Sequence, residues 1–237
     1  MSVMAVPPPT PPPPDPWLFP APGPDGFTAD DLADLSDEGG HAEIVDGTLL
    51  VSRPGGFTVD DLDRIPGGDG NRYELIDGML VVSPAPGMPH QVVVTRLAML
   101  LTAACPPDLF VLGSSPAIRT GRHGSVEPDV VVLRKADVAA AFDRPYTGVP
   151  VLAVEVLSPS GRTFDRLVKR TIYARIGVPT YWIIDPSPRT GPAITALRLD
   201  LATGEYQDDA SVDPGGILTT AEPFPVTLRL SDLHDLG

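Results

Sequence analysis

The chain has 237 residues, of which 42% are hydrophobic and 20% charged, and its formal net charge is −14. This composition is ordinary for a globular protein, and the length allows one good-sized domain with extensions. The negative charge argues against a protein that coats nucleic acid through phosphate contacts alone, but it is compatible with an enzyme whose small site uses a metal ion. The single cysteine, Cys105, excludes an internal disulfide framework.

The first 25 residues are rich in proline. Eleven of the 30 prolines fall between Pro7 and Pro24, a density typical of polyproline II or disordered segments that build no hydrophobic core. We therefore expect residues 1–25 to form a solvated tail, with binding of another protein through an aromatic-lined groove as the alternative. We find neither a signal-peptide pattern nor an apolar run of about 18 residues, so we expect a cytoplasmic protein without membrane contact.

A unit of about 30 residues occurs twice, over residues 26–52 and 56–83. The two copies read GFTADDLADLSDEGGHAEIVDGTLLVS and GFTVDDLDRIPGGDGNRYELIDGMLVVS. Each predicts a short helix with a threonine N-cap and then two strands joined by Asp-Gly, which is a strong hairpin signal. Because the second copy continues directly into the rest of the chain, we expect residues 56–237 to form the main domain. Residues 26–55 would add an extra helix and an edge hairpin.

The main domain alternates helical and strand patterns in chain order. Apolar residues at helical spacing after Pro89 predict its first helix, and Gly177 is a typical helix end. The expected helices are 89–104, 136–142 and 163–176, and the expected strands are 109–119, 126–133, 151–157, 180–184, 194–200 and 225–230. This order predicts an α/β or α+β fold in which helices flank a mixed sheet, with hairpins added at the N-terminal side.

Two acidic residues interrupt apolar strands of the main domain. Glu155 lies inside VLAVEVL, and Asp129 opens an apolar strand in VEPDVVVL. An ionised carboxylate buried in such a strand costs several kcal/mol unless it is paired or binds a metal ion. We therefore expect the two carboxylates to meet and hold Mg²⁺, which takes one or two protein carboxylates and keeps several waters. Taken singly, Asp129 could instead cap a turn and Glu155 could pair with a basic residue.

Several motifs resemble those of the Uma-two family in the PD-(D/E)XK nuclease superfamily. They are YELIDG, SPAPGMPHQ, EPDVVV, VEVLSPS and YARIGVPTYWIID, and they occur in the expected order over roughly residues 56–200. The resemblance implies a restriction-endonuclease-like fold with a phosphodiesterase site that depends on Mg²⁺ or Mn²⁺. Asp129 matches the acid of the first superfamily motif, and Glu155 matches the acid of the second.

One position departs from the superfamily pattern, which places a lysine two residues after the second acid. Leu157 stands there in this chain. Migrated lysines of the superfamily lie on the following helix, where Lys169 follows Asp165 by one turn. The resemblance therefore assigns to Lys169 the role of positioning the attacking water. The alternative is an ordinary surface ion pair between Asp165 and Lys169, worth under about 1 kcal/mol.

Three further residues are candidates for the site. Glu74, in the YELIDG hairpin, could supply another acid to the metal ion or to its surroundings. His90, just inside a helix start, could contact phosphate or cap the helix. Arg119 could touch nucleic acid or lie in a solvated loop. Three aromatic residues are expected in the core: Tyr173, Tyr181 and Trp182.

The sequence thus predicts a metal-dependent endonuclease that hydrolyses phosphodiester bonds of nucleic acid, with DNA favoured over RNA. Asp129 and Glu155 would bind the metal ion, and Lys169 would position water for in-line attack at phosphorus. Nucleases of this fold often pair to cut two strands, so a homodimer is compatible with the prediction. The alternative is a nuclease fold that no longer cuts and serves as a binding or assembly module, which the displaced lysine and the net charge of −14 favour.

Overall fold

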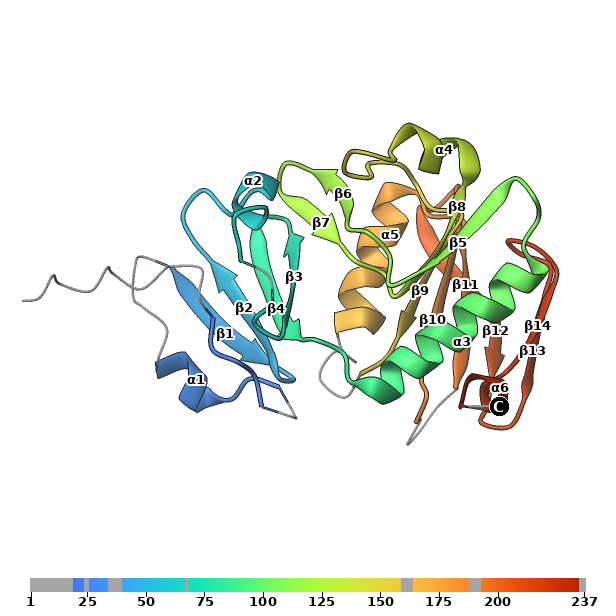
Figure 1. Cartoon of the computed structure of the whole chain (residues 1–237), viewed down its shortest axis with the longest axis horizontal. Helices are drawn as coiled ribbons and strands as arrows, with labels where there is room; N and C mark the ends of the chain where they lie inside the picture. The colour runs from blue at the N-terminus through green and yellow to red at the C-terminus, as the bar shows by residue number, and fades with distance from the viewer. Residues whose placement is uncertain are drawn as a thin grey trace, which may run out of the picture.

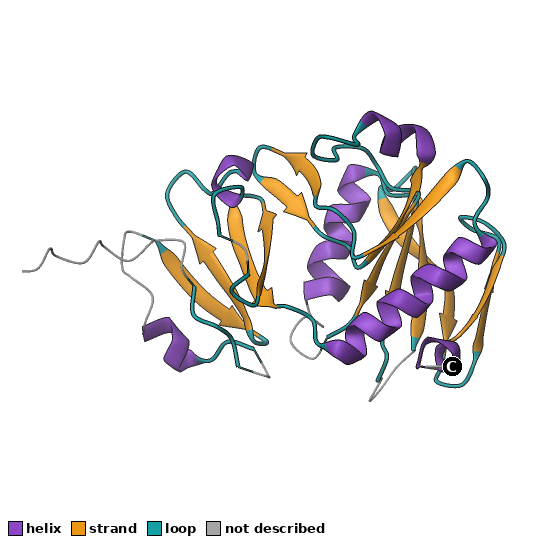
Figure 2. Cartoon of the chain, in the orientation of Figure 1, coloured by secondary structure: helices purple, strands orange, loops and turns teal. Residues whose placement is uncertain are grey.

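A computed structural model of the chain describes residues 19–23, 26–33, 40–66, 68–158, 164–187 and 193–234. Over these ranges the protein is a mixed α+β structure with two six-stranded sheets, a two-stranded sheet and flanking helices (Figures 1 and 2). The predicted fold class is confirmed. Most of the predicted proline-rich tail, residues 1–18 and 24–25, lies outside the described residues. Among the helices that are described, none is long and apolar enough to cross a membrane.

The first sheet joins the two copies of the duplicated unit. In spatial order its strands are β1 (His41–Val45), β2 (Thr48–Ser52), β4 (Met79–Pro84), β3 (Asn71–Ile76), β7 (Gly124–Val126) and β6 (Ile118–Gly121). The copies begin with the short helices α1 (Ala29–Ala33) and α2 (Val59–Leu62). Both hairpins turn at Asp-Gly, where Asp46 and Asp77 each have a φ of 49°, as primed hairpin turns require. The first hairpin forms the edge of the sheet, and the domain boundary at residue 55 stays a prediction.

A local two-fold axis relates the two hairpins. In the antiparallel β2–β4 pair, Leu50 lies opposite Val81, and the neighbours on both sides pair in register. Within the hairpins, residues of the second copy follow their counterparts by 31 positions, so Leu50 and Val81 are equivalent and the axis passes through this pair. The backbone N–H of Phe27 and that of Phe57 each donate to the turn glycine of their own hairpin, at 2.9 and 2.7 Å. The outer strands of the two hairpins are β1 and β3. Strand β1 forms the edge of the sheet, whereas β3 pairs with β7 and contacts the second sheet.

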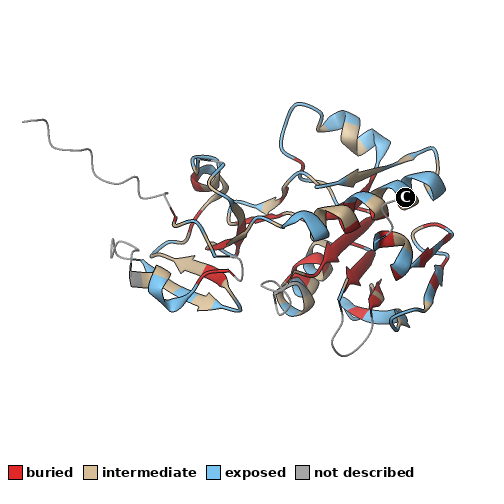
Figure 3. Ribbon diagram, turned by 60° about the horizontal axis from the view of Figure 1, so that its bottom comes forward, coloured by how far each residue is buried: buried red, intermediate tan, exposed pale blue. Residues whose placement is uncertain are grey.

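The second sheet carries the main core. In spatial order its strands are β12 (Glu205–Val212), β11 (Ile194–Asp200), β10 (Thr180–Ile184), β9 (Leu152–Val156), β8 (Val130–Arg134) and β5 (Leu109–Gly113). All five residues of β9 are buried (Figure 3). Alternate β9 residues join the apolar cluster of α3 (Met88–Ala104) on one face and that of α5 (Arg170–Ile176) on the other. The remaining elements are α4 (Lys135–Ala140), the π-helical segment Phe164–Lys169, the hairpin of β13 (Ile217–Thr220) and β14 (Val226–Arg229), and α6 (Leu230–His234).

Some predicted elements differ from the structure at their boundaries. The expected strands 109–119 and 126–133 are each divided between the two sheets, as β5 and β6 and as β7 and β8. The first division falls after Ser114, whose φ of 54° ends the extended backbone, and the second falls at Pro128. The expected helix 163–176 begins with a π-helical segment, and it ends at Gly177 with a φ of 83°, as predicted. Strand β12, with a mostly exposed EYQDDASV pattern, was not predicted.

The start of α2 gives a pH-dependent stability prediction. Asp61 Oδ2 accepts hydrogen bonds from the Thr58 N–H at 2.9 Å, the Thr58 hydroxyl at 2.7 Å and Arg53 Nη2 at 2.5 Å. Burial raises the pKa of Asp61, but these donors lower it by more, so that the pKa is about 2. Because the folded pKa is depressed, the stabilisation is complete above about pH 4 and is lost as the pH falls from about 4 to about 2.

We therefore expect Asp61→Ala to lower the free energy of unfolding by about 1–2 kcal/mol at pH 7. Urea unfolding at several pH values should show the difference from wild type shrinking between pH 4 and pH 2. The exposed neighbour Asp60 provides the matched control, Asp60→Ala. A deficit in Asp61→Ala that is the same at pH 2 and pH 7 would contradict the prediction.

Candidate active site

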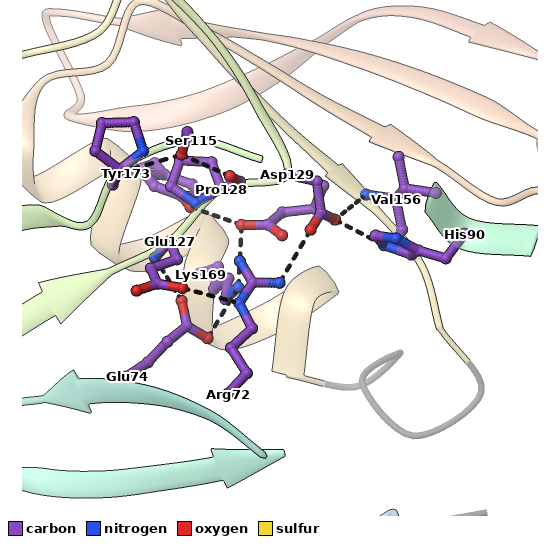
Figure 4. A network of polar contacts seen from close by, with 12 residues as sticks. Arg72, Glu74, His90, Ser115, Glu127, Pro128, Asp129, Val156, Lys169 and Tyr173 are labelled. Carbon is purple, nitrogen blue, oxygen red and sulfur yellow. Dashed lines mark hydrogen bonds and ion pairs between the residues drawn. The ribbon is translucent and has the colours of Figure 1, made fainter. Parts of the chain in front are cut away.

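A cluster of charged side chains lies between the two sheets, at the start of β8 and the end of β9 (Figure 4). Asp129, the residue before β8, donates its N–H to the Val154 carbonyl at 3.0 Å, and the β8–β9 register places it opposite Glu155. Asp129 is 5% exposed and Glu155 is 1% exposed. The structure thus brings together the two acids singled out in the sequence. The cluster comprises the buried Glu74, Asp129, Glu155 and Lys169, the half-buried Arg72, His90 and Glu127, and the neutral, buried Tyr173.

Three donors hold the Asp129 carboxylate. Oδ1 accepts from Arg72 Nη1 at 3.0 Å, whereas Oδ2 accepts from the Val156 N–H at 2.8 Å and from His90 Nε2 at 3.1 Å. Burial raises the pKa of Asp129, but the hydrogen bond from His90 and the nearby positive charges lower it by more. The pKa of this carboxyl therefore lies well below its ordinary value, and Asp129 is ionised at neutral pH.

Lys169 joins Glu155 to the hairpin sheet. Its ammonium lies 3.1 Å from Glu155 Oε1 and 3.0 Å from Glu74 Oε2. The lysine itself is 2% exposed, so the alternative of an ordinary surface ion pair is wrong for it. The Asp165 side chain lies outside the described residues. The structure thus places Glu74 and Lys169 with Glu155, as the sequence analysis anticipated.

Tyr173 combines a core position with a contact to the site. It is fully buried, like Tyr181 and Trp182, which confirms the expected core location of all three. Its hydroxyl donates to Glu155 Oε1 at 2.6 Å, a contact that the sequence analysis did not anticipate. Burial, and then the negative charge of Glu155, raises the pKa of Tyr173 well above its ordinary value. The hydroxyl therefore keeps its proton and remains a hydrogen-bond donor to this carboxylate.

Arg72 is a site residue that the sequence analysis missed. Its Nη1 contacts Asp129, and its Nε lies 3.4 Å from Glu127 Oε2. Burial lowers the pKa of Arg72, but the surrounding carboxylates raise it by more, to well above the ordinary value. A signal was present in RYELIDG, because residues i and i+2 of a strand share a face. With Glu74 directed toward the second sheet, Arg72 had to point the same way.

Glu127 completes the contacts between β3 and the second sheet. Its backbone N–H donates to Glu74 Oε1 at 2.7 Å, while its carboxylate pairs with Arg72. Burial raises the pKa of Glu127, and the positive charge of Arg72 opposes this only in part. Arg72 and Glu74 therefore attach the hairpin sheet to the segment that carries Asp129.

His90 lies beside the cluster at the first turn of α3. Its Nε2 is 2.9 Å from the Val156 carbonyl as well as 3.1 Å from Asp129 Oδ2. Since both partners are acceptors, Nε2 carries a proton. Nδ1 is buried and has no hydrogen-bond partner in the described part of the chain. The helix-capping alternative is not observed, because the N-cap is Gly87 and no side chain caps it.

Arg119 lies apart from the cluster. It belongs to β6 and pairs with Asp63 at 2.5 Å. The structure therefore places it in a strand and not in a solvated loop. It lines a cleft that adjoins the cluster, described below.

Two hollows that share lining residues adjoin the cluster. A small cavity of about 40 Å³ is lined by Glu74, Asp129, Glu155 and Lys169, together with other residues. A larger cleft of about 580 Å³ lies beside it, between β3 and the first turns of α3. Arg72 and His90 line both hollows, as does Asp129. The small cavity exceeds the roughly 10–15 Å³ that one water requires, so it has room for a small hydrated group.

The donor set of the small cavity fits a divalent cation. No group of three or more His, Cys, Asp or Glu side chains arranged to hold a metal ion occurs in the described ranges, but Mg²⁺ needs only one or two protein carboxylates. Among the described residues of the cluster, the carboxylates Glu74, Glu127, Asp129 and Glu155 outnumber the basic side chains Arg72 and Lys169 by two. One divalent cation would balance this excess.

Comparisons with known proteins bear on both family and fold. A family model with the description "Uma2: Putative restriction endonuclease" matches residues 59–232. No curated protein matches the chain. Among solved structures, the chain is similar to "a putative nuclease belonging to DUF820" from Anabaena variabilis ATCC 29413, with a TM-score of 0.59 and 17% sequence identity. That match covers 75% of this chain and 97% of the other, and at such low identity it shows the fold alone.

Proposed function

The chain belongs to the Uma2 family, and from this premise we propose that it is a divalent-metal-dependent endonuclease that hydrolyses phosphodiester bonds of DNA. The observation that carries the proposal is the meeting of two nearly fully buried acids, Asp129 and Glu155, with the buried Lys169. Charges are rarely buried unless they are paired or functional. The description of the family as a restriction endonuclease favours DNA over RNA.

Asp129 and Glu155 would hold the metal ion, Mg²⁺ or Mn²⁺. Such an ion, when bound, polarises a phosphate and makes a water molecule more acidic. The donors around Asp129 keep its carboxylate ionised, which is the state that a cation requires. The Tyr173 hydroxyl fixes the Glu155 carboxylate from the side of α5.

The neighbouring side chains have separate roles in the proposed reaction. Lys169, 3.1 Å from Glu155, would orient the attacking water by a hydrogen bond and offset the charge that develops on the phosphate. Glu74, at 3.0 Å from the ammonium, would hold this lysine in place. Arg72 and His90 face the adjoining cleft, where the planar arginine fork suits phosphate oxygens.

The first test is Mn²⁺ binding measured by calorimetry, which requires no knowledge of the substrate. We expect the wild type to bind Mn²⁺, and Asp129→Asn and Glu155→Gln each to abolish binding. Asp63→Asn is the matched control, because Asp63 is an ion-paired acid that lines the cleft but is not in the cluster. The control should bind Mn²⁺ like the wild type.

Two results would count against the proposal. Binding that survives both substitutions would place the metal ion elsewhere. Absence of binding in the wild type at millimolar Mn²⁺, with or without an added oligonucleotide, would favour the nuclease fold that no longer cuts. A cytoplasmic location, a homodimer and a protein-binding tail stay predictions from the sequence.

A further inference from the structure

The larger cleft adjoins the proposed active site, and part of its lining is not shared with the small cavity. On the side of the first sheet it is lined by Tyr73, by Leu62 at the end of α2 and by Ile65, and on the side of α3 by Gln91 and Val94. Arg72, His90 and Asp129 form the part that it shares with the small cavity. A phosphate in reach of Asp129 would therefore have its attached nucleoside in this cleft.

The size of the cleft decides what can enter. A volume of about 580 Å³ falls within the roughly 300–1,000 Å³ that is usual for small-molecule sites. One nucleotide fits such a space, but stacked base pairs do not. A base enters a pocket of this kind only after it leaves the helical stack or when it belongs to a single strand.

The charges of the cleft lead to the same conclusion. Among the described residues that line it, the basic ones are Arg72, His90 and Arg119, and the acidic ones are Asp63, Glu127 and Asp129. Both arginines pair with these acids. Duplex binding usually draws its affinity from about 6–10 phosphate contacts, whereas the described residues that line the cleft offer two arginines and one histidine, and the net charge of −14 opposes binding of a polyanion.

The chemistry of the cleft suits a base. The exposed parts of Leu62 and Ile65 can pack on the flat face of any base, and Gln91 and the backbone can bond its edge. Stacking of a base on an aromatic ring changes the affinity for a single strand by about 5- to 150-fold, and we expect these apolar contacts to give the lower part of that range. They are also insensitive to the negative charge of the protein.

We propose that the substrate is unpaired DNA, a single strand or a locally unpaired segment, and that the base beside the cut phosphate lies in the cleft between β3 and α3. This inference rests on the proposed nuclease function. One chain then suffices for one cut, because no second strand has to be reached.

Binding to fluorescein-labelled oligonucleotides without divalent metal tests the proposal independently of cleavage. Three DNAs of the same length are compared: a single strand, its perfect duplex, and a single strand carrying abasic sites. We expect the single strand to bind at least about 10-fold more tightly than either of the others. The logarithm of the association constant should fall with the logarithm of the salt concentration with a slope of about −1.4, as expected for two phosphate contacts on a single strand. Six phosphate contacts on a duplex would give a slope of about −5.

A variant pair on α3 locates the base. Gln91→Trp narrows the cleft, and Met99→Trp, at an exposed position of the same helix, is the matched control. We expect Gln91→Trp to remove the preference for the strand with bases over the abasic strand, and the control to keep it. If the introduced tryptophan instead stacks on the base, the preference for the strand with bases over the abasic strand would increase, which would also place the base beside residue 91. An unchanged preference would overturn the proposed location.

The outcomes separate this inference from the function on which it rests. Equal affinity for duplex and single strand, or for strands with and without bases, overturns the inference whether or not the protein cuts. A base-dependent preference for single strands without any metal-dependent cleavage overturns the nuclease function and leaves the binding cleft standing.

Discussion

Replacing Glu155 by Gln should lower kcat for metal-dependent DNA cleavage by about 10³-fold or more. The side chain keeps its shape and still accepts from the Tyr173 hydroxyl, but it loses the charge that pairs with Lys169 at 3.1 Å. A metal ion at such a site stabilises the transition state by several kcal/mol, and about 4 kcal/mol corresponds to 10³ in rate. The measurement is single-turnover cleavage of a circular single-stranded DNA and of a linear duplex, at an Mn²⁺ concentration that saturates the wild type.

Loss of folding must be separated from loss of chemistry in this experiment. Removing one partner of a buried ion pair destabilises a protein by about 3–5 kcal/mol, so the folded fraction is measured by urea unfolding under the assay conditions. Glu74→Gln removes the other carboxylate partner of Lys169 and serves as the comparison. We expect Glu74→Gln to lose about as much stability as Glu155→Gln but to lose less of its cleavage rate, because Glu74 is proposed to hold the lysine and not the metal ion. Equal activity losses per folded molecule in the two variants would refute the separate roles.

The acids of the site could be predicted because each is a charged residue in an otherwise apolar strand segment. A carboxylate within the apolar strand VLAVEVL must be paired or must bind a metal ion. The alternation of side chains along a strand then indicates on which face of the sheet its partner lies. The structure places Glu155 in β9, with every residue of that strand buried. Pairing of β8 with β9 then followed from two short apolar strands in one sheet. The family resemblance added Lys169, which composition and spacing alone would have left as one lysine on a helix.

Arg72 and the division of two strands could not be predicted in the same way. The strand face that Arg72 shares with Glu74 indicates only the direction of its side chain. Arg72 contributes to the site because β3 of the first sheet faces the start of β8 in the second, and contacts between sheets leave no local pattern. The segment from residue 109 to residue 119 carries a loop signal in Gly-Ser-Ser-Pro at residues 113–116, but a loop signal does not indicate that the chain changes sheets there. Tertiary contacts, and not strand propensity, decide such cases.

The largest remaining effect is expected for Lys169→Met, which removes the ammonium and keeps most of the buried volume. If Lys169 orients the attacking water, kcat should fall by about 10²–10⁴-fold, while Mn²⁺ binding by Asp129 and Glu155 persists. A loss of cleavage rate with retained Mn²⁺ binding distinguishes the lysine from the metal ligands, because substitution of a metal ligand should remove Mn²⁺ binding as well as cleavage. Lys169→Arg keeps the charge in a different geometry and should recover only part of the rate.

The double variant Leu157→Lys, Lys169→Met tests whether the lysine has migrated. Leu157 lies two residues beyond Glu155 and is 2% exposed, so a lysine there would extend from the same strand face toward the same carboxylate. We expect the double variant to be at least about 10-fold faster than Lys169→Met per folded molecule, with Leu157→Met, Lys169→Met as the matched control. A Lys169→Met protein that binds Mn²⁺ and cleaves at the wild-type rate would show that the ammonium is structural. The site would then have to activate water through its two carboxylates alone.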